Sequence, residues 1–341
     1  MGDAAPAESE RARAAARSRV IVVLGPTAGG KSDLAMELAR RFGGELVSAD
    51  SMQVYRGMDI GTAKPTAEER AEIHHHLIDL VEASHEGFTV AEWLRLADQA
   101  IADIQARGRV PIVVGGTNLY IRAFLEGLDE APPADEALRA ELAEIPSEEL
   151  HRRLAAIDAA AAARLHANDR RRVTRALEIA SSTGATPSER RTAWADGAIA
   201  PRRGDLFVVL LDWPVELINR RINARVGRMV EAGLLDEVRG LLARGGICSQ
   251  ARAACGYEEF AEVVASEQRE APESPRGARL RAKLLDEAIE RTKIRSRRLA
   301  KQQRTWLKRF RAIAPGLSIE CDASITAQSL AAACERALAH A

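Results

Sequence analysis

The segment V-I-V-V-L-G-P-T-A-G-G-K-S, from Val20 to Ser32, decides the fold of this chain. Its first five residues form a continuous apolar run, which is typical of a central parallel strand covered on both faces. The G-x-x-x-x-G-K-S spacing that follows predicts a loop whose backbone N–H groups bind a phosphate at the positive N-terminus of a helix. Lys31 adds a positive charge, and the Ser32 hydroxyl is suited to bind Mg²⁺. The predicted anion-binding residues are Gly25, Pro26, Thr27, Ala28, Gly29, Gly30, Lys31 and Ser32.

Three more apolar segments are predicted to extend the same sheet. They are residues Glu45 to Ser48, Ile112 to Val114 and Leu206 to Leu211. Helical patterns, such as Asp33 to Arg41 and Thr89 to Ala106, alternate with them. Strands that alternate with helices favour a parallel, doubly wound α/β sheet, here of the P-loop type, and such sheets bind ligands at the C-terminal ends of their strands.

Between the third and fourth predicted strands lies a long Ala-rich, charged tract with a helical pattern and no strand signal. It predicts an all-helical subdomain inserted into the α/β core. The Ala-rich start of mixed charge is predicted to be disordered, and the residues after Ala312 are predicted to form a short helix. The predicted divisions are a disordered segment 1–18, the core in two parts 19–128 and 205–312, the inserted subdomain 129–204 with a linker at 188–204, and a tail 313–341.

The composition limits the possible partners and compartments. The 341 residues, 46% of them hydrophobic, are enough for one or two domains. Formal net charge is zero, so any nucleic acid must be bound by a local basic patch. The four cysteines form no C-x-x-C pair, which favours neither a zinc site nor disulfides and fits a reducing cytoplasm. Because no apolar run approaches the length of a membrane span, we expect a cytoplasmic protein without a membrane partner.

Asp50 follows the second predicted strand and is therefore expected beside the phosphate loop. A carboxylate there can bind Mg²⁺ through water, accept a hydrogen bond from an attacking amine or hydroxyl, or cap the segment that starts at Ser51. A P-loop on its own suggests a nucleotide kinase or an ATPase, and Asp212, after the fourth strand, is a candidate Walker-B aspartate. The third strand instead ends in G-G-T, Gly115 to Thr117, which favours close approach of a substrate.

The segment D-S-M-Q-V-Y-R-G-M-D-I-G-T-A-K-P-T, Asp50 to Thr66, resembles the tRNA dimethylallyltransferases. These enzymes place a five-carbon prenyl group on N6 of adenosine 37, beside the anticodon. The resemblance spans roughly residues 20–310, and its motifs are highly specific in combination with a P-loop. The further matching segments are Gly115 to Tyr120, Glu126 to Leu128, Leu165 to Glu178, Arg221 to Leu234, Gly256-Tyr257 and Lys293 to Phe310.

The resemblance implies a donor, dimethylallyl diphosphate, in the phosphate loop in place of ATP. It also implies that Arg221 or Arg225 helps to hold the diphosphate, together with Mg²⁺ on Ser32. Asp50 would accept the proton of the adenine amine, and Thr117 would make a second hydrogen bond near the reacting base. From the residues alone, Thr117 is almost equally suited to cap the helix predicted from Asn118.

The resemblance further implies RNA contacts in three parts of the chain. Arg291 to Arg311 contains ten Lys or Arg and no acid, although such a run is usually a solvated helix face. Gln53 is suited to a base edge, whereas Met52 is equally suited to core packing. The adenine itself would have to be flipped out of its stack. The predicted tRNA contacts are Asp50, Ser51, Met52, Gln53, Thr117, Arg139, Arg171, Arg172, Val173, Thr174 and Arg175.

Departures from the family pattern and rival functions remain. Gly29 stands where the family's loops usually carry Ser, and the acids Glu258 and Glu259 follow Tyr257 where a basic residue is often seen. The zinc finger appended in eukaryotic members is missing, so we expect a bacterial-type enzyme. We also expect a monomer. The alternatives are an adenylate isopentenyltransferase that prenylates free nucleotides, a P-loop nucleotide kinase, and a protein that only binds RNA.

Overall fold

The computed structural model describes residues 4–129, 132, 135–190, 201–269, 274–313 and 316–340. The chain divides into two compact units, and each is described by itself. Unit 1 comprises Met1–Leu125 and Pro201–Ala341, and unit 2 comprises Glu126–Ala200.

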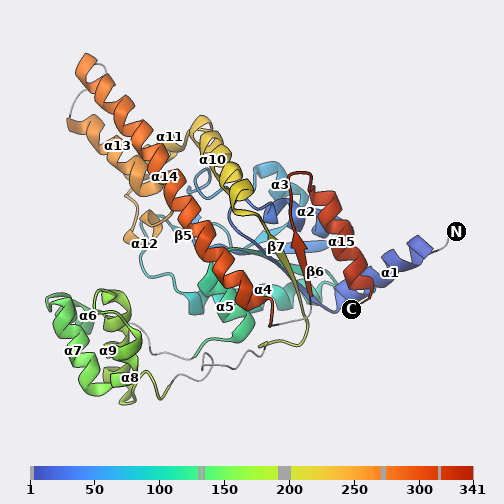
Figure 1. Ribbon diagram of the computed structural model, residues 1–341, viewed down its shortest axis with the longest axis horizontal. Helices are drawn as coiled ribbons and strands as arrows, with labels where there is room; N and C mark the ends of the chain where they lie inside the picture. The colour runs from blue at the N-terminus through green and yellow to red at the C-terminus, as the bar shows by residue number, and fades with distance from the viewer. Residues whose placement is uncertain are drawn as a thin grey trace. The chain divides into compact units, whose positions relative to one another are not determined.

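Unit 1 is built on a six-stranded sheet in the order β4-β2-β6-β1-β7-β8 (Figure 1). Every strand pair in it is parallel. All residues of β1 and β2 are buried, as expected of central strands covered on both faces. The predicted doubly wound, P-loop-type sheet is confirmed. Its strands are β1 (Val20–Leu24), β2 (Gly44–Ala49), β4 (His75–His76), β6 (Val110–Gly115), β7 (Leu206–Asp212) and β8 (Gly316–Glu320).

Two hydrophobic clusters cover the two faces of the sheet, because successive side chains of a strand point to opposite faces. Val20, Val22 and Leu24 of β1 belong to one cluster. Ile21 and Val23 belong to the other. The first cluster also contains residues of α4 (Val90–Ala106), α5 (Asn118–Glu126), α11 (Leu234–Ala243), α13 (Tyr257–Arg269) and part of α14 (Pro275–Phe310). The second also contains residues of α1 (Ala4–Arg17), α2 (Lys31–Phe42), α15 (Ala327–Ala339) and the first half of α10 (Val215–Glu231).

Short elements complete unit 1. The segment after β2 forms a two-stranded parallel sheet of β3 (Tyr55–Arg56) and β5 (Val81–Glu82), with α3 (Ala67–Glu72) between them. One further short helix, α12 (Ser249–Arg252), precedes α13. In Figure 1, α13 and the 36-residue α14 run side by side as a helical hairpin.

The two ends of the chain differ from the sequence prediction. Residues 4–17 of the predicted disordered segment 1–18 form the helix α1 instead. The small side chains Ala12 and Ala16 are fully buried, and Ser9 Oγ donates a hydrogen bond of 2.7 Å to Glu335 Oε1 on α15. An Ala-rich segment therefore becomes ordered because a second helix covers its alanine face. The C-terminal tail also contains β8, an edge strand with only partly buried alternate residues, which the prediction of a single helix omitted.

Unit 2 contains four helices and, among its described residues, no strand. Its small core includes Leu142, Leu150, Leu154 and Val173. The predicted subdomain 129–204 overlaps this unit. Most of the predicted linker at 188–204, namely residues 191–200, lies outside the described residues. The helices are α6 (Glu136–Ala143), α7 (Ser147–Ile157), α8 (Ala159–Arg164) and α9 (Arg170–Thr183).

A buried lysine holds the segment that follows Asp50. The Lys64 side chain is 0% exposed, and its Nζ donates to Tyr55 O at 2.5 Å. The same ammonium group pairs with Asp59 Oδ1 at 2.9 Å and with Asp79 Oδ1 at 2.6 Å. The lysine of the G-T-A-K-P motif is therefore an anchor for the loop between β2 and β5.

Replacement of Lys64 tests this anchor. In Lys64→Ala, two carboxylates lose a buried cation, so we expect the free energy of unfolding to fall by about 2–4 kcal/mol. The control is Arg56→Ala, which breaks an exposed pair with Glu82 and is expected to cost less than about 1 kcal/mol. Urea unfolding followed by circular dichroism measures both. Equal losses in the two variants would contradict the anchoring role.

Candidate active site

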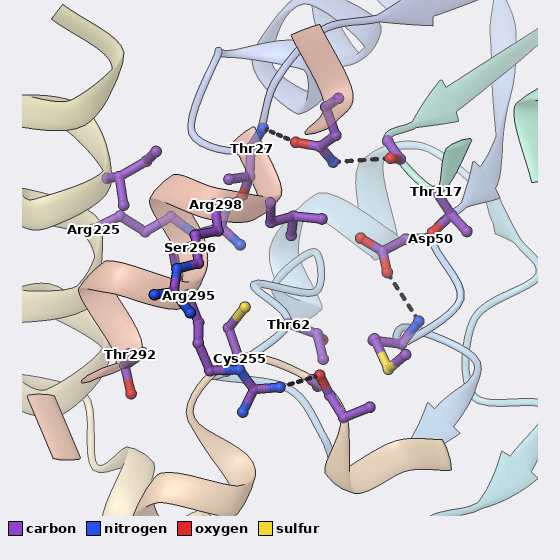
Figure 2. Close-up of a pocket in the computed structure, with 18 of the residues that line it drawn as sticks. Thr27, Asp50, Thr62, Thr117, Arg225, Cys255, Thr292, Arg295, Ser296 and Arg298 are labelled. Carbon is purple, nitrogen blue, oxygen red and sulfur yellow. Dashed lines mark hydrogen bonds between the residues drawn. The ribbon is translucent and has the colours of Figure 1, made fainter. Parts of the chain in front are cut away.

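A cavity of about 500 Å³ lies where β1, β2 and β6 end (Figure 2). Asp50 after β2 and Thr117 after β6 line one side. The other side is formed by Thr27 of the phosphate loop, by α10, by α14 and by the turn before α13. The cavity thus lies at the C-terminal edge of the sheet, where parallel α/β proteins bind their ligands.

The phosphate loop has the backbone that its sequence predicts. Gly30 adopts a left-handed conformation (φ 81°) immediately before α2, which directs the N-terminus of the helix toward the loop. Lys31 Nζ donates to Pro26 O at 2.9 Å across the loop. Gly29 has no room for a side chain, because a Cβ there would lie 2.8 Å from Pro26 O. A side chain at this departure from the family pattern would therefore require the backbone at Pro26 to shift.

Two side chains outside the loop support it. Trp213 Nε1 donates to Gly29 O at 3.0 Å, and Arg221 Nε donates to Ala28 O at 2.8 Å. The Arg221 guanidinium also lies over the Trp213 ring, 4.6 Å from its centroid. Arg221 thus contacts the outside of the loop and does not line the cavity, whereas Arg225 lines it and donates to Thr27 Oγ1 at 3.1 Å.

Positive charge gathers on the loop side of the cavity. Desolvation and the neighbouring charge of Arg225 lower the pKa of Lys31 to about 8, while Asp50 opposes this shift. Burial also lowers the pKa of Arg225. Arg295 and Arg298 of α14 line the same cavity. Cations removed from water are stabilised by an anion placed between them, so this side is suited to bind a phosphate or diphosphate.

Asp50 and Thr117 form the other side of the cavity. Asp50 Oδ1 accepts the Met52 N–H at 2.9 Å, which is the capping bond anticipated from the sequence. Figure 2 shows the carboxylate pointing into the cavity, so the same group caps the turn and faces the substrate space. Thr117 Oγ1 accepts the Ser51 N–H at 2.9 Å and donates to Ser51 Oγ at 3.2 Å. The two sequence-predicted catalytic residues are therefore linked through Ser51.

Sequence reasoning missed Gln303, which lies within the basic segment of α14. Its amide accepts the Thr27 N–H at 2.7 Å and donates to Gly116 O at 2.8 Å. The only sequence signal was a polar, uncharged residue inside a run of Lys and Arg that matches the family.

The predicted RNA contacts after Asp50 divide into two groups. Ser51 and Met52 line the cavity. The Gln53 amide instead accepts from Ser48 Oγ at 2.8 Å and donates to Thr62 O at 3.3 Å, which holds the turn from inside. Contact of Gln53 with a base edge stays a prediction.

In unit 2, two predicted RNA contacts share one buried carboxylate. Arg139 and Arg175 both form ion pairs with Glu178, whose side chain is 1% exposed. Arg171 and Arg172 are exposed and Thr174 is half-buried. The side chain of Val173 is 0% exposed in the unit's core, and the RNA contact at this residue stays a prediction.

The basic segment of α14 is less positive than its sequence alone indicates. Arg291 pairs with Glu262, and Arg295 pairs with Glu259 at 2.8 Å. The acids after Tyr257 thus neutralise part of the helix.

A second cluster of metal-binding residue types lies at the edge of the sheet. Atoms of Glu45, His74 and His76 lie within 4.8 Å of one another. The Glu45 carboxylate already accepts from Arg107 NH2 at 2.7 Å and contacts His76 Nε2 at 2.7 Å. Because a guanidinium supplies the positive charge and Mg²⁺ prefers oxygen ligands, this cluster is not the predicted magnesium site.

The comparisons with known proteins agree with this geometry. Residues 53–310 match the family model described as IPP transferase. A tRNA dimethylallyltransferase of Anaeromyxobacter dehalogenans (strain 2CP-C) is 51% identical over 300 residues, which cover 86% of this chain and 93% of the relative. One from Geobacter metallireducens is 45% identical over 300 residues, 86% of this chain and 90% of that protein.

Solved structures give the same result. The tRNA isopentenylpyrophosphate transferase of Bacillus halodurans is 37% identical with a TM-score of 0.61, covering 95% of this chain and 97% of that one. A eukaryotic dimethylallyltransferase, described as acting on tRNA, is 29% identical with a TM-score of 0.71. The match covers 88% of this chain and 73% of that one.

Fold, cavity and comparisons together define a P-loop-type transferase, and the chain belongs to the IPP transferase family. The relatives in this family carry the name tRNA dimethylallyltransferase, so the resemblance inferred from the sequence is confirmed. In the parts of the chain that the structure describes, no helix is both long and apolar enough to cross a membrane.

The lowered pKa of Lys31 gives a test of the anion site. An alkyl diphosphate placed beside Lys31 favours its charged form and so raises its pKa again. At pH 9 the lysine is mostly neutral in the free protein, so we expect binding to take up about one proton, and almost none at pH 7. Titration calorimetry in two buffers of different ionisation enthalpy measures this uptake. Lys31→Met should abolish it, and no uptake by the unaltered protein at pH 9 would count against the site.

Proposed function

We propose that this chain transfers the dimethylallyl group from dimethylallyl diphosphate to N6 of adenosine 37 in tRNA and releases diphosphate. One observation carries the proposal: a carboxylate and a hydroxyl, Asp50 and Thr117, face the same cavity as the cationic phosphate loop. Family membership supports the reaction type.

The donor side explains how the leaving group is stabilised. When the bond between C1 of the prenyl group and the diphosphate oxygen breaks, that oxygen keeps the electron pair and gains negative charge. Lys31, Arg225 and the loop N–H groups would lie around that charge and stabilise the transition state. Ile222, Val226 and Met229 of α10 supply an apolar wall suited to the five-carbon group.

The acceptor side explains how a weak nucleophile is used. The lone pair of the adenine N6 amine is delocalised into the ring, and the amine becomes cationic as the new bond to C1 forms. Asp50 then takes the surplus proton as general base, which typically accelerates such steps about 10²- to 10⁴-fold. Thr117 and Ser51, which hydrogen-bond each other, would orient the base.

Mg²⁺ is part of the proposal, and its site passes a chemical test. Ser32 is an exposed residue in the first turn of α2, directly after Lys31, and the carboxylate of Asp50 lines the cavity next to Thr27 of the same loop. Oxygen donors next to a bound diphosphate are the ligands that Mg²⁺ prefers. Ser32 would hold the ion, which when bound would neutralise diphosphate charge.

The RNA partner would be bound by basic side chains of both units. Arg298 at the cavity and the exposed Arg171 and Arg172 of unit 2 are the proposed phosphate contacts, together with Arg139 and Arg175. Action as a monomer is part of the proposal. Free thiols at all four cysteines support a reducing, cytoplasmic location.

The reaction is tested with three substrates. The protein is incubated with dimethylallyl diphosphate and either an anticodon stem-loop containing A36-A37 or AMP, and separately with ATP. We expect prenylation of the stem-loop alone and no ATP hydrolysis. Prenylation of AMP alone would favour a free-nucleotide enzyme, and ATP hydrolysis without prenylation would favour a kinase or ATPase.

The role of Asp50 gives a second prediction. Asp50→Asn keeps the shape and the acceptor oxygen for the Met52 N–H but removes the base, so we expect single-turnover transfer to fall about 10²- to 10⁴-fold. Binding of the stem-loop should change little. Asp103→Asn, on the exposed face of α4, is the matched control. Unchanged transfer in Asp50→Asn would remove this residue from the mechanism.

A further inference from the structure

We propose that Gln303 is a positioning residue that holds the diphosphate loop and the acceptor side of the cavity at a fixed separation. This inference rests on the proposed function and names a residue that the motifs did not single out. Gln303 lies on α14, far in sequence from both parts of the site that it joins.

The hydrogen bonds of Gln303 determine the orientation of its amide. The backbone N–H of Thr27 can only donate and the carbonyl of Gly116 can only accept. The side-chain oxygen must therefore face Thr27, at 2.7 Å, and the side-chain nitrogen must face Gly116, at 2.8 Å. A neutral amide of this length satisfies both partners at once, whereas a carboxylate or an ammonium satisfies only one.

Burial and close contact make this bridge rigid. Gln303 is 5% exposed, so each lost hydrogen bond would leave a polar group without water. A Cβ on Gly116 would lie 2.4 Å from Gln303 Nε2 and 3.6 Å from Lys31 Nζ. The second glycine of the G-G-T sequence is therefore needed so that the amide can reach the backbone after β6.

Contacts continue from both ends of the bridge into the reacting groups. On one side, Thr27 accepts from Arg225, the guanidinium beside the anion site. On the other side, Gly116 precedes Thr117, which hydrogen-bonds Ser51 next to Asp50. Figure 2 shows Thr27, Arg225, Asp50 and Thr117 around the same space.

The chemistry requires such a connection. In a displacement at carbon, the amine nitrogen, C1 and the leaving oxygen must be aligned, and a misplacement of about 1 Å can cost roughly 10²-fold in rate. The loop fixes the leaving oxygen and Thr117 fixes the base. Both are attached to strands that pair, and Gln303 adds a side-chain bridge from the loop backbone to Gly116 beyond the ends of these strands.

The test is a set of variants in single-turnover transfer from dimethylallyl diphosphate to the A36-A37 stem-loop. Gln303→Met keeps the length but removes both hydrogen bonds. We expect its transfer rate to fall about 10- to 100-fold, while the dissociation constants of the stem-loop and of the unreactive thio analogue of the donor change less than about threefold. Gln99→Met, exposed on α4, is the matched control and should keep the normal rate.

Gln303→Glu separates positioning from general support of the fold. Its carboxylate still accepts from Thr27 but cannot donate to Gly116, and it adds negative charge beside the anion site. We expect weaker binding of the thio analogue together with slower transfer, in contrast to Gln303→Met. A thermal melt shows whether each variant folds. If Gln303→Met does not fold, Gln303→Glu still tests the proposal.

A double-mutant cycle with Thr117→Val decides the mechanism of the effect. If Gln303 acts by placing Thr117, the two losses in rate are less than additive. Additive losses, or a normal rate in Gln303→Met, would overturn the proposal. Absence of transfer by the unaltered protein in the same assay would instead reject the proposed function, so the two failures are distinguishable.

Discussion

The parallel pairing of β1, β2 and β6 is the constraint on which the site depends. Because the three strands run in the same direction, the phosphate loop, Asp50 and the Gly116-Thr117 turn all emerge at one edge of the sheet. These groups are far apart along the sequence, since each follows a different strand. Hydrogen bonds across the edge, from Thr117 to Ser51 and from Gln303 to both the loop and Gly116, then convert proximity into a defined geometry.

The cavity is electrically polarised. Lys31 and Arg225 are desolvated on one side, and the carboxylate of Asp50 lies on the other. Without a ligand this arrangement is costly, as the lowered pKa values of the two cations indicate. A negatively charged donor removes that cost and so completes the electrostatics of the site. The same reasoning explains why the supporting groups, Trp213 and Arg221, bond the loop carbonyls from outside and leave its inner face to the ligand.

Local patterns in the sequence were sufficient to predict the sheet, the phosphate loop and the position of Asp50, because apolar runs and glycine spacing depend on neighbouring residues. Features that arise from contacts distant in sequence were not predictable. Gln303 bridges two segments that precede it by many residues, and α1 is ordered mainly by its packing on α15. The sequence of β8 contains few apolar residues, because an edge strand pairs with only one other strand and its side chains are at most partly buried. Val173 matched a family motif, but a motif does not indicate whether a side chain points inward or outward.

The insertion of unit 2 between β6 and β7 affects how the core can form. β1 lies between β6 and β7 in the sheet, so its second neighbour is synthesised only after the whole of unit 2 has emerged. Until then the strand that carries the phosphate loop has an open edge, and an unpaired edge of this kind readily pairs with other chains. Contacts of such long sequence separation also form slowly. Unit 2, with its own small hydrophobic core, can fold in the meantime, and β8 pairs with β7 later still. Completion of the sheet around the strand that carries the phosphate loop therefore waits for the segments that follow unit 2.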